Sequence, residues 1–221
     1  MKISISKENH LKAIFHLESD HGTVTTNELA AALHTRPASI TDMLKKLQKE
    51  GLVLYERYKG FSLSQDGKMA AVQIIRNHRL WECFLVDHLD FDWSQVHEMA
   101  EELEHLTSRK LIDRLDFFLG FPRTDPHGDP IPDSDGKFTR QIAQIPLPNL
   151  LTGKEATVTA IRPQTDQILE LLQHKKIKIG TRITIRKKFD FDDSLEIEVD
   201  GGASTTVSAL VAKNIYVSVQ K

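Results

Sequence analysis

The chain has 221 residues, of which 40% are hydrophobic and 27% are charged, as is ordinary for a globular protein. Its sequence contains no stretch approaching the roughly 18 consecutive apolar residues of a membrane span, so we expect a cytoplasmic protein without a membrane partner. The single cysteine, Cys83, excludes an internal disulfide and any site built from several thiolates.

The net charge of -2 conceals an uneven distribution of charge along the chain. Residues 1–76 carry a net charge of +3, residues 77–150 carry -7, and residues 151–221 carry +2. The acidic middle third also contains five of the ten histidines. A basic segment followed by an acidic, histidine-rich one suggests polyanion binding by the first and cation binding by the second.

The first part of the chain has the element order of a winged helix-turn-helix. Hydrophobic periodicity, capping residues and turns predict three helices and two strands, in order at residues 7–18, 26–33, 37–50, 52–55 and 60–63. Thr25 or Thr26 would cap the second helix, with Glu28 in its first turn. This order predicts a DNA-binding domain over residues 1–70.

The third predicted helix is the candidate recognition helix. It would present small, hydroxyl and basic side chains, namely Arg36, Pro37, Ala38, Ser39, Thr41, Lys45 and Lys46. Small residues let the backbone approach the major groove, and serine, threonine and arginine can reach base edges or phosphates. The tip between the two strands adds Arg57, Tyr58 and Lys59, where flanking DNA would lie. These features favour double-stranded DNA as the partner over a protein-interaction module.

A helical domain is predicted over residues 71–140. Its helices are expected at about 65–88, 94–107 and 108–119, followed by an ordered connection rich in proline, glycine and aspartate. In VHEMAEELEH, residues 96–105, histidines and glutamates fall on one narrow helical stripe and apolar residues on another. So many carboxylates on one stripe require a positive partner, either basic side chains or a metal ion.

The same domain holds six ligand-type residues at helical spacing, namely His78, Glu82, His97, Glu101, Glu104 and His105. Histidine and carboxylate ligands without thiolates suit Mn(II) or Fe(II), while Zn(II), Co(II) and Ni(II) can compete for such a site. For any single pair, a surface ion pair is the alternative interpretation. Six such residues on two consecutive helices indicate a metal site.

Two enzymatic motifs are incomplete in this region. The segment HEMAE departs from the H-E-x-x-H zinc protease motif, because Glu101 stands where the second histidine is required. Glu102 and His105 form one Glu-x-x-His pair, but a di-iron carboxylate bundle needs a second copy on another core helix. The other copy, Glu18 with His21, lies at the end of the first predicted helix. We therefore expect a protein that is not an enzyme.

The C-terminal region changes to the two-residue period of β-strands. Strands are predicted at 155–161, 182–189, 195–201 and 215–220, with a short helix at 164–174. Four or five short strands in so small a region indicate a small barrel. We expect a linker over residues 141–154 and a separate domain over residues 155–221. The fold class is thus mainly α with a small β domain.

Four segments together resemble one known family over nearly the whole chain: RPASITDMLKKLQKEGLV, RNHRLWECFL, VHEMAEELEH and DPHGDPIP. The family is that of the diphtheria toxin repressor, whose metal-dependent transcriptional regulators include the manganese transport regulators. The resemblance implies an N-terminal winged helix-turn-helix, a helical metal-binding and dimerisation domain, and a C-terminal SH3-like β-barrel.

The resemblance also implies two metal sites. The primary site would take its ligands from Glu101, Glu104, His105, Asn9 and Asp125. The second site would take its ligands from His78, Glu82 and His97, completed by Gln164 or Asp166 of the SH3-like domain.

Two positions depart from the family pattern. Asn9 stands where relatives have a methionine or an aspartate, and it offers a neutral oxygen ligand. Lys12 stands where the binuclear manganese regulators have a glutamate, so the carboxylate that a manganese pair would share is missing.

Functionally, the resemblance implies a homodimer that binds a palindromic operator and represses metal-uptake genes when Mn(II) or Fe(II) activates it. Other divalent transition metals can substitute. An apolar face is expected to form a metal-independent dimer interface, from Val96, Ala100, Leu103, Leu111 and Leu115. The alternatives are a metal-independent winged-helix regulator, whose acidic stripe is merely solvated, and a metal-dependent hydrolase.

Overall fold

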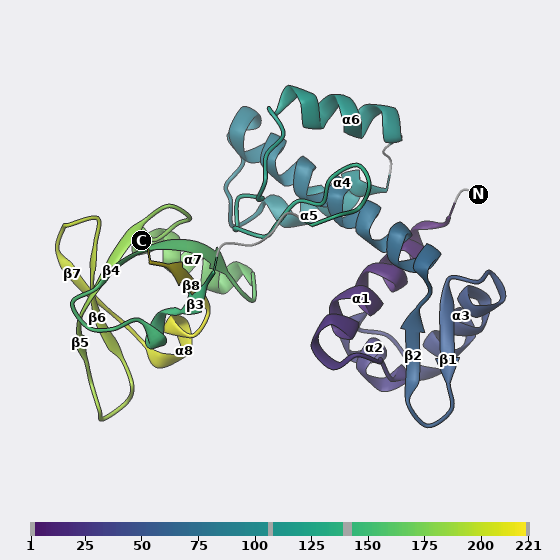
Figure 1. The fold of residues 1–221 in the computed structure, drawn as a ribbon, viewed down its shortest axis with the longest axis horizontal. Coiled ribbons are helices and arrows are strands. Elements are labelled where there is room, and N and C mark those ends of the chain that lie inside the picture. The colour runs from purple at the N-terminus through teal and green to yellow at the C-terminus, as the bar shows by residue number, and fades with distance from the viewer. Residues whose placement is uncertain (1–2, 106–107, 139–142, 220–221) are drawn as a thin grey trace. The chain divides into compact units, whose positions relative to one another are not determined.

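The computed structural model describes residues 3–105, 108–138 and 143–219 (Figure 1). The chain divides into two compact units. The first combines Met1–His78 with Glu101–Arg114 and Pro132–Lys137, and the second combines Arg79–Ala100 with Leu115–Ile131 and Phe138–Lys221. Within the described residues, every helix is too short or too polar to cross a membrane.

The N-terminal part of the first unit has the predicted winged helix-turn-helix order. Its elements are α1 Ile5–His21, α2 Thr26–Ala32, α3 Pro37–Lys49, β1 Val53–Glu56 and β2 Gly60–Leu63. Helix α2 begins with a capping box: the Thr25 hydroxyl accepts the Glu28 amide at 3.3 Å, and the Glu28 carboxylate accepts the Thr25 amide at 2.7 Å. Of the two residues predicted as the cap, Thr25 and Thr26, the structure uses Thr25.

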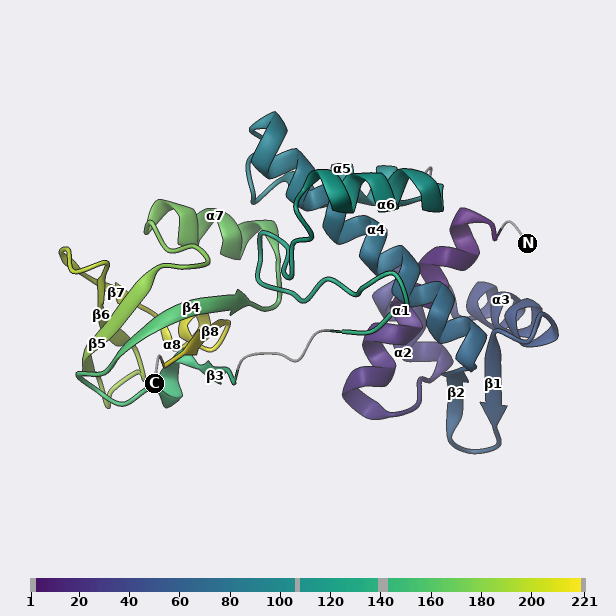
Figure 2. The same cartoon turned by 45° about the horizontal axis from the view of Figure 1, so that its top comes forward.

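The core of this winged helix is built from one face of each helix and the inward side of the hairpin. Its fully buried side chains include Leu11, Ile14, Leu29, Ile40, Leu44 and Leu47. The last three lie at i, i+4 and i+7 on α3, which leaves the opposite face of that helix in solvent. The loop that joins β1 to β2 projects away from the helices (Figure 2).

Three helices follow, namely α4 Gln65–Leu89, α5 Val96–Glu104 and α6 Arg109–Phe118. Val96 and Ala100 are fully buried within the single chain, so they cannot supply the dimer interface expected from the sequence. The expectation was wrong for these two residues and for the buried Leu115, because helical periodicity shows that a face is apolar but not what covers it, whereas Leu111 of the same expected interface is 47% exposed. Exposed apolar side chains lie instead on or just after α6, where Phe117 is 66% exposed and Phe121 is 61% exposed.

The C-terminal region is an antiparallel six-stranded sheet with the order β3-β8-β4-β5-β6-β7. The strands are β3 Ile145–Pro146, β4 Glu155–Ile161, β5 Arg182–Lys188, β6 Leu195–Val199, β7 Ser204–Val207 and β8 Ile215–Ser218. Helices α7 Asp166–His174 and α8 Ala209–Ala212 accompany the sheet (Figure 1). Alternate strand residues, such as Ile183, Ile185 and Ile197, fill the interior.

Part of the segment expected to be a linker is ordered against this sheet. Ile145 and Pro146 pair with β8 as β3, and Leu147 and Leu150 are buried in the same core. The short strand β7 pairs with β6 and was also missing from the sequence prediction. Strand β3 has only two residues, and β7 has a single apolar side chain, Val207, so neither shows a hydrophobic period and pairing with a neighbour decides them.

A tight contact in the second unit leads to a stability prediction. Gly128 has φ +89°, and a Cβ at this position would lie 2.0 Å from the Thr159 carbonyl oxygen of β4. We expect Gly128→Ala to lower the free energy of unfolding by at least about 3 kcal/mol, because the loop must leave the strand. Thermal or urea denaturation of the metal-free protein measures the loss.

Gly153→Ala is the matched control for this measurement. Gly153 also has a positive φ, +77°, but its Cβ would meet nothing within 4 Å. Only the backbone strain applies there, which costs about 1 kcal/mol. If both variants lost the same free energy of unfolding, the close contact between Gly128 and β4 would not contribute to stability beyond the backbone strain.

Candidate metal centres and nucleic-acid interface

A first cluster of ligand-type side chains lies between α1, α4 and α5 of the first unit. The Nδ1 atom of His78 lies 2.6 Å from Glu104 Oε2, and the Nε2 atom of His105 lies 3.3 Å from Glu104 Oε1. His78, Glu101 and Glu104 each offer a ligand atom, and these atoms lie within 4.8 Å of one another. The side chain of Glu104 is fully buried. The structure thus brings together Glu101, Glu104 and His105, the expected core of the primary site.

Helix α1 contributes a carboxylate to this cluster and has a buried amide oxygen at the neighbouring position. The side-chain oxygen of Asn9 is buried and has no hydrogen-bond partner. A buried carbonyl oxygen without a donor is unfavourable unless an ion or a water binds it, so Asn9 fits its expected role as a ligand. Glu8, which the sequence interpretation missed, lies with Oε2 2.6 Å from His105 Nδ1. Its position beside Asn9 at the start of the helix was the available signal.

The positive partner of the acidic stripe is a lysine from α1. The Nζ atom of Lys12 lies 2.6 Å from Glu101 Oε1 and 2.7 and 3.0 Å from the two oxygens of Glu104. The sequence required either basic side chains or a metal ion here. A basic side chain is present at this cluster, and it contacts the carboxylates expected to be metal ligands.

A second cluster lies within the second unit and joins Glu82, Asp125 and His127, all of them buried. Ligand atoms of these three residues lie within 4.8 Å of one another. His97 adds to the cluster, because its Nδ1 lies 3.2 Å from Glu82 Oε1. Glu82 and His97, two expected ligands of the second site, are therefore neighbours, while Asp125, expected at the primary site, lies here.

The imidazole of His127 has one nitrogen, Nδ1, that is available to bind a metal ion. Its Nε2 lies 2.7 Å from the main-chain carbonyl oxygen of Trp93, which can only accept a hydrogen bond, so Nε2 carries the proton. Its Nδ1 is buried and has no hydrogen-bond partner. Metal-binding histidines typically donate their other N–H to a backbone carbonyl, so this arrangement fits a ligand. His127 was missed in the sequence, although it lies in the quoted segment DPHGDPIP.

The charges in this cluster also favour a cation. Burial raises the pKa of Asp125 to about 7, and the negative charges of Glu82 and Asp129 add to the rise. Burial alone would lower the pKa of His127, but the carboxylate of Glu82, whose Oε2 lies 3.8 Å from Nδ1, and then the charge of Asp125 raise it overall. Both directions follow from excess negative charge in a buried place. A divalent ion would neutralise that charge.

The C-terminal domain reaches the loop that carries this cluster. The Gln164 amide donates to Asp129 Oδ2 at 2.8 Å, and the Arg162 guanidinium donates to Asp129 Oδ1 at 2.8 Å. Gln164, an expected ligand, thus bonds Asp129 rather than the three clustered ligand atoms. The side chain of Asp166, the other expected ligand, lies outside the described residues.

The candidate nucleic-acid interface is the solvent face of α3 with the β1–β2 loop. The exposed residues on or beside α3 include Arg36, Pro37, Ala38, Ser39, Lys45 and Lys46. Thr41 is half-buried, and its hydroxyl donates to the Pro37 carbonyl at 3.0 Å. This face therefore offers small and basic side chains to a ligand, as the sequence predicts.

The loop between β1 and β2 carries its own basic and aromatic side chains. Tyr58 is 88% exposed, has a positive φ of 67°, and lies under the guanidinium of Arg57 at 4.8 Å. Lys59 pairs with Glu56 at 2.8 Å, and the pKa of Lys59 is raised by that hydrogen bond and charge. An exposed loop of this composition suits contact with a phosphate backbone.

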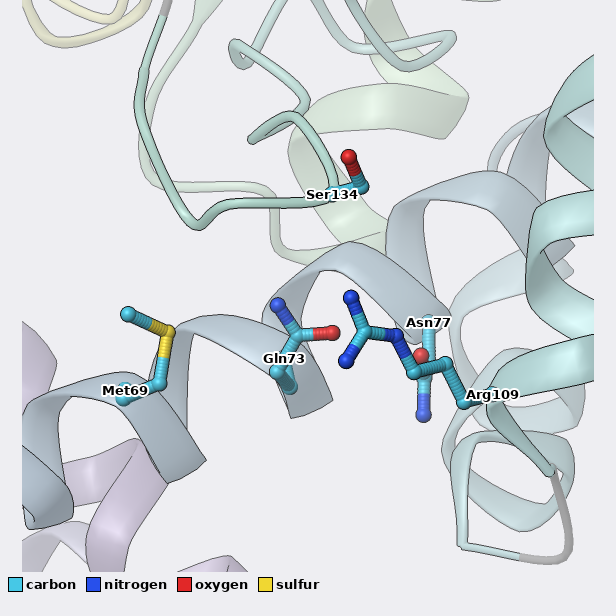
Figure 3. A pocket seen from close by; sticks show the side chains of 5 residues that line it. All are labelled: Met69, Gln73, Asn77, Arg109 and Ser134. Atoms are coloured by element: carbon cyan, nitrogen blue, oxygen red, sulfur yellow. The ribbon is translucent and has the colours of Figure 1, made fainter.

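A pocket of about 300 Å³ in the first unit is a separate feature (Figure 3). Met69, Gln73 and Asn77 of α4 line it together with Arg109 and Ser134. The Arg109 guanidinium lies over the α4 side, near Gln73 and Asn77 (Figure 3). The lining residues carry amides, a hydroxyl, a thioether and a guanidinium, so this pocket lacks the carboxylate and imidazole donors of the two clusters.

Three family models match successive parts of the chain. The model described as "Iron dependent repressor, N-terminal DNA binding domain" matches residues 2–61. The model described as "Iron dependent repressor, metal binding and dimerisation domain" matches residues 64–133. The "FeoA domain" model matches residues 145–219.

Individual proteins are similar over the same regions. The HTH-type transcriptional regulator MntR of Lysinibacillus sphaericus is 33% identical over 110 residues, which are 50% of this chain and 78% of that relative. The iron-dependent repressor IdeR of Mycobacterium tuberculosis is 30% identical over 125 residues, 57% of this chain and 54% of that relative. A solved manganese-dependent transcriptional repressor in complex with manganese is 30% identical with a TM-score of 0.85, and the match covers 97% of this chain and 100% of that one.

Proposed function

Because the chain belongs to the diphtheria toxin repressor family of metal-dependent, DNA-binding transcriptional repressors, we propose that Mn(II) or Fe(II) activates it to bind a palindromic operator of metal-uptake genes in the cytoplasm. The observation that carries this proposal is the first cluster. It joins Glu8 and Lys12 of α1, in the DNA-binding domain, to Glu104 and His105 of the metal-binding and dimerisation domain.

An ion held at this cluster would restrain the DNA-binding domain relative to α5. This restraint favours operator binding. When the recognition helix α3 already has fewer orientations in the free protein, less conformational entropy is lost as DNA binds. Couplings of this kind are typically 1–3 kcal/mol, or about 5- to 150-fold in affinity. That range is sufficient for a switch between a repressed and an expressed gene.

The donor atoms support Mn(II) over Fe(II) as the activating ion. The first cluster offers oxygen and imidazole nitrogen from Asn9, Glu101, Glu104 and His105, and it includes neither a thiolate nor a thioether among the described residues. Harder oxygen donors suit Mn(II), although ligand type alone leaves Zn(II), Co(II) and Ni(II) able to compete. The second cluster would hold another ion through Glu82, Asp125 and His127, with His97 beside them.

The direct test of the function is a DNA titration with and without metal. A duplex selected from a random library in Mn(II) is titrated with the protein in Mn(II), in Fe(II) under anaerobic conditions, and in chelator. We expect at least a fivefold loss of affinity in chelator. Equal affinity in all three conditions would favour a metal-independent winged-helix regulator instead.

Substitutions on α3 are expected to separate two kinds of DNA contact. Lys45→Ala or Lys46→Ala should weaken binding to all sequences alike and reduce the salt dependence by about one unit per lost phosphate contact. Arg36→Ala or Ser39→Ala should instead change which bases are preferred. Binding to a panel of operator mutants at several salt concentrations measures both effects. A uniform loss in all four variants would contradict the assignment of α3 as the recognition helix.

A further inference from the structure

The ammonium group of Lys12 can direct all three of its N–H donors to carboxylate oxygens of the first cluster. An ammonium has three N–H groups and no acceptor, and Lys12 Nζ has three carboxylate oxygens within 3.0 Å, one of Glu101 and two of Glu104. The lysine side chain is 15% exposed, and that of Glu104 is fully buried. The pairing with Glu104 is therefore buried and charge-assisted, whereas the pairing with Glu101 lies nearer the surface, because the Glu101 side chain is 41% exposed.

The oxygens that Lys12 holds are the oxygens that a divalent ion would need. Glu101 and Glu104, with Glu8 on the far side of His105, supply the negative charge of the cluster, whereas Asn9 and the two imidazoles, when neutral, supply none. Two cations cannot share the same carboxylate oxygens at close range without strong repulsion. The Lys12 ammonium must therefore withdraw from these oxygens, at least in part, when a divalent ion binds there.

We propose that Lys12 is a resident cation that stands in for the metal in the metal-free protein, and that activation is an exchange of this ammonium for a divalent ion. The proposal deepens the proposed function and rests on it. Lys12 already links α1 to Glu101 and Glu104 before any ion is present. Metal binding replaces that link with one that also uses the unpartnered Asn9 oxygen, three residues earlier on the same helix.

This exchange makes Lys12 a residue that sets the metal threshold. Competition with the ammonium weakens the apparent metal affinity, so the site fills only when the free ion is abundant. The same ammonium protects the metal-free protein, because a buried carboxylate without a counter-charge destabilises the fold. Removing the charge of Lys12 should therefore tighten metal binding and destabilise the metal-free chain at the same time.

The test compares Lys12→Met with the parent in a Mn(II) titration without DNA, in which calorimetry measures the binding. The first cluster is identified as the binding event that is lost in Glu104→Gln. We expect Lys12→Met to bind Mn(II) at this cluster about tenfold more tightly, equivalent to about 1.4 kcal/mol. In chelator its Tm should be lower than that of the parent by about 5 °C, and Mn(II) should raise that Tm by more than it raises the Tm of the parent.

Lys7→Met is the matched control, because it removes the same charge from the same helix. Lys7 pairs with Glu50 at 2.5 Å, outside the cluster. Its Mn(II) affinity should match that of the parent. Lys12→Gln, which keeps a donor without the charge, is the second variant if Lys12→Met does not fold, and it should also bind Mn(II) more tightly.

The outcomes separate this inference from the function on which it rests. Unchanged or weaker Mn(II) binding in both Lys12 variants, with a parent that still binds DNA in a Mn(II)-dependent way, overturns the exchange and leaves the repressor function in place. A parent that neither binds Mn(II) at the cluster nor responds to it on DNA overturns both. A lower Tm in chelator without tighter Mn(II) binding shows a purely structural lysine and also overturns the exchange.

Discussion

Glu104→Gln is expected to abolish the activation of operator binding by Mn(II). Glu104 is the centre of the first cluster, because His78, His105 and Lys12 all contact its carboxylate and its side chain is fully buried. Glutamine keeps the shape but removes the charge that an ion requires. We expect the 5- to 150-fold activation typical of such couplings to fall to about onefold, while weak, salt-sensitive DNA binding persists.

The stability of the metal-free variant provides a second measurement. Because His78 loses its carboxylate partner and Lys12 keeps only Glu101, the free energy of unfolding in chelator should fall by about 2 kcal/mol. Glu102→Gln is the matched control, since Glu102 is an exposed glutamate on the same helix and has the same charge. A Glu104→Gln protein that still responds to Mn(II) with an unchanged midpoint would show that the first cluster is not the activating site.

Phe117→Asp is expected to produce a monomer that no longer binds the operator tightly. Phe117, Phe118 and Phe121 are each more than 60% exposed in the single chain. Clustered exposed aromatic side chains are typical of an interface, and this segment lies within the matched metal binding and dimerisation domain. A charge at the centre of such a face would be buried without a partner on dimerisation. We expect at least a 100-fold loss of operator affinity, equivalent to about 2.7 kcal/mol.

Sedimentation at micromolar concentration measures the oligomeric state directly. Phe118 is left unchanged because it contacts Phe84 and His88 within the chain, so its replacement would also disturb the protomer. Phe191→Asp is the control, since Phe191 is 99% exposed on the β5–β6 loop of the C-terminal domain. A Phe117→Asp protein that remains dimeric would place the interface elsewhere.

The dimer also explains why the operator is expected to be palindromic. A twofold axis presents the same α3 face twice, and such reading heads contact half-sites about 34 Å apart or at a multiple of that spacing. Mutating one half-site should then weaken binding in the dimer but not in the Phe117→Asp monomer.

Local sequence patterns predicted most of the fold. The strand at 155–161 and the start of α3 at Pro37 match the structure, because alternation, capping residues and proline act over a few residues. The strands β3 and β7 were not predicted, since they depend on pairing with β8 and β6. The burial of Val96 and Ala100 could likewise not be predicted from the sequence, because it depends on which segments pack over their helix.

The candidate site was predictable where its residues share one helix. Glu101, Glu104 and His105 stand together on or beside α5, and helical spacing alone groups them. The roles of Lys12 and His127 come from contacts between segments distant in sequence, with Glu104 and Glu82 respectively. Single-sequence reasoning shows that a positive charge is needed beside the acidic stripe, but only the fold shows that α1 delivers it.

The first cluster has a consequence for how such regulators diversify. Its residues fall on both sides of the boundary between the two matched repressor models, which end at residue 61 and begin at residue 64. A hybrid that exchanges the DNA-binding domain for that of a relative would therefore also exchange the residues at positions 8, 9 and 12. The metal response of the hybrid would follow the new pairing of α1 with α5 and not either parent. We therefore expect operator recognition and metal preference to be inherited together, because α1, which contacts the cluster, belongs to the same domain as the recognition helix α3.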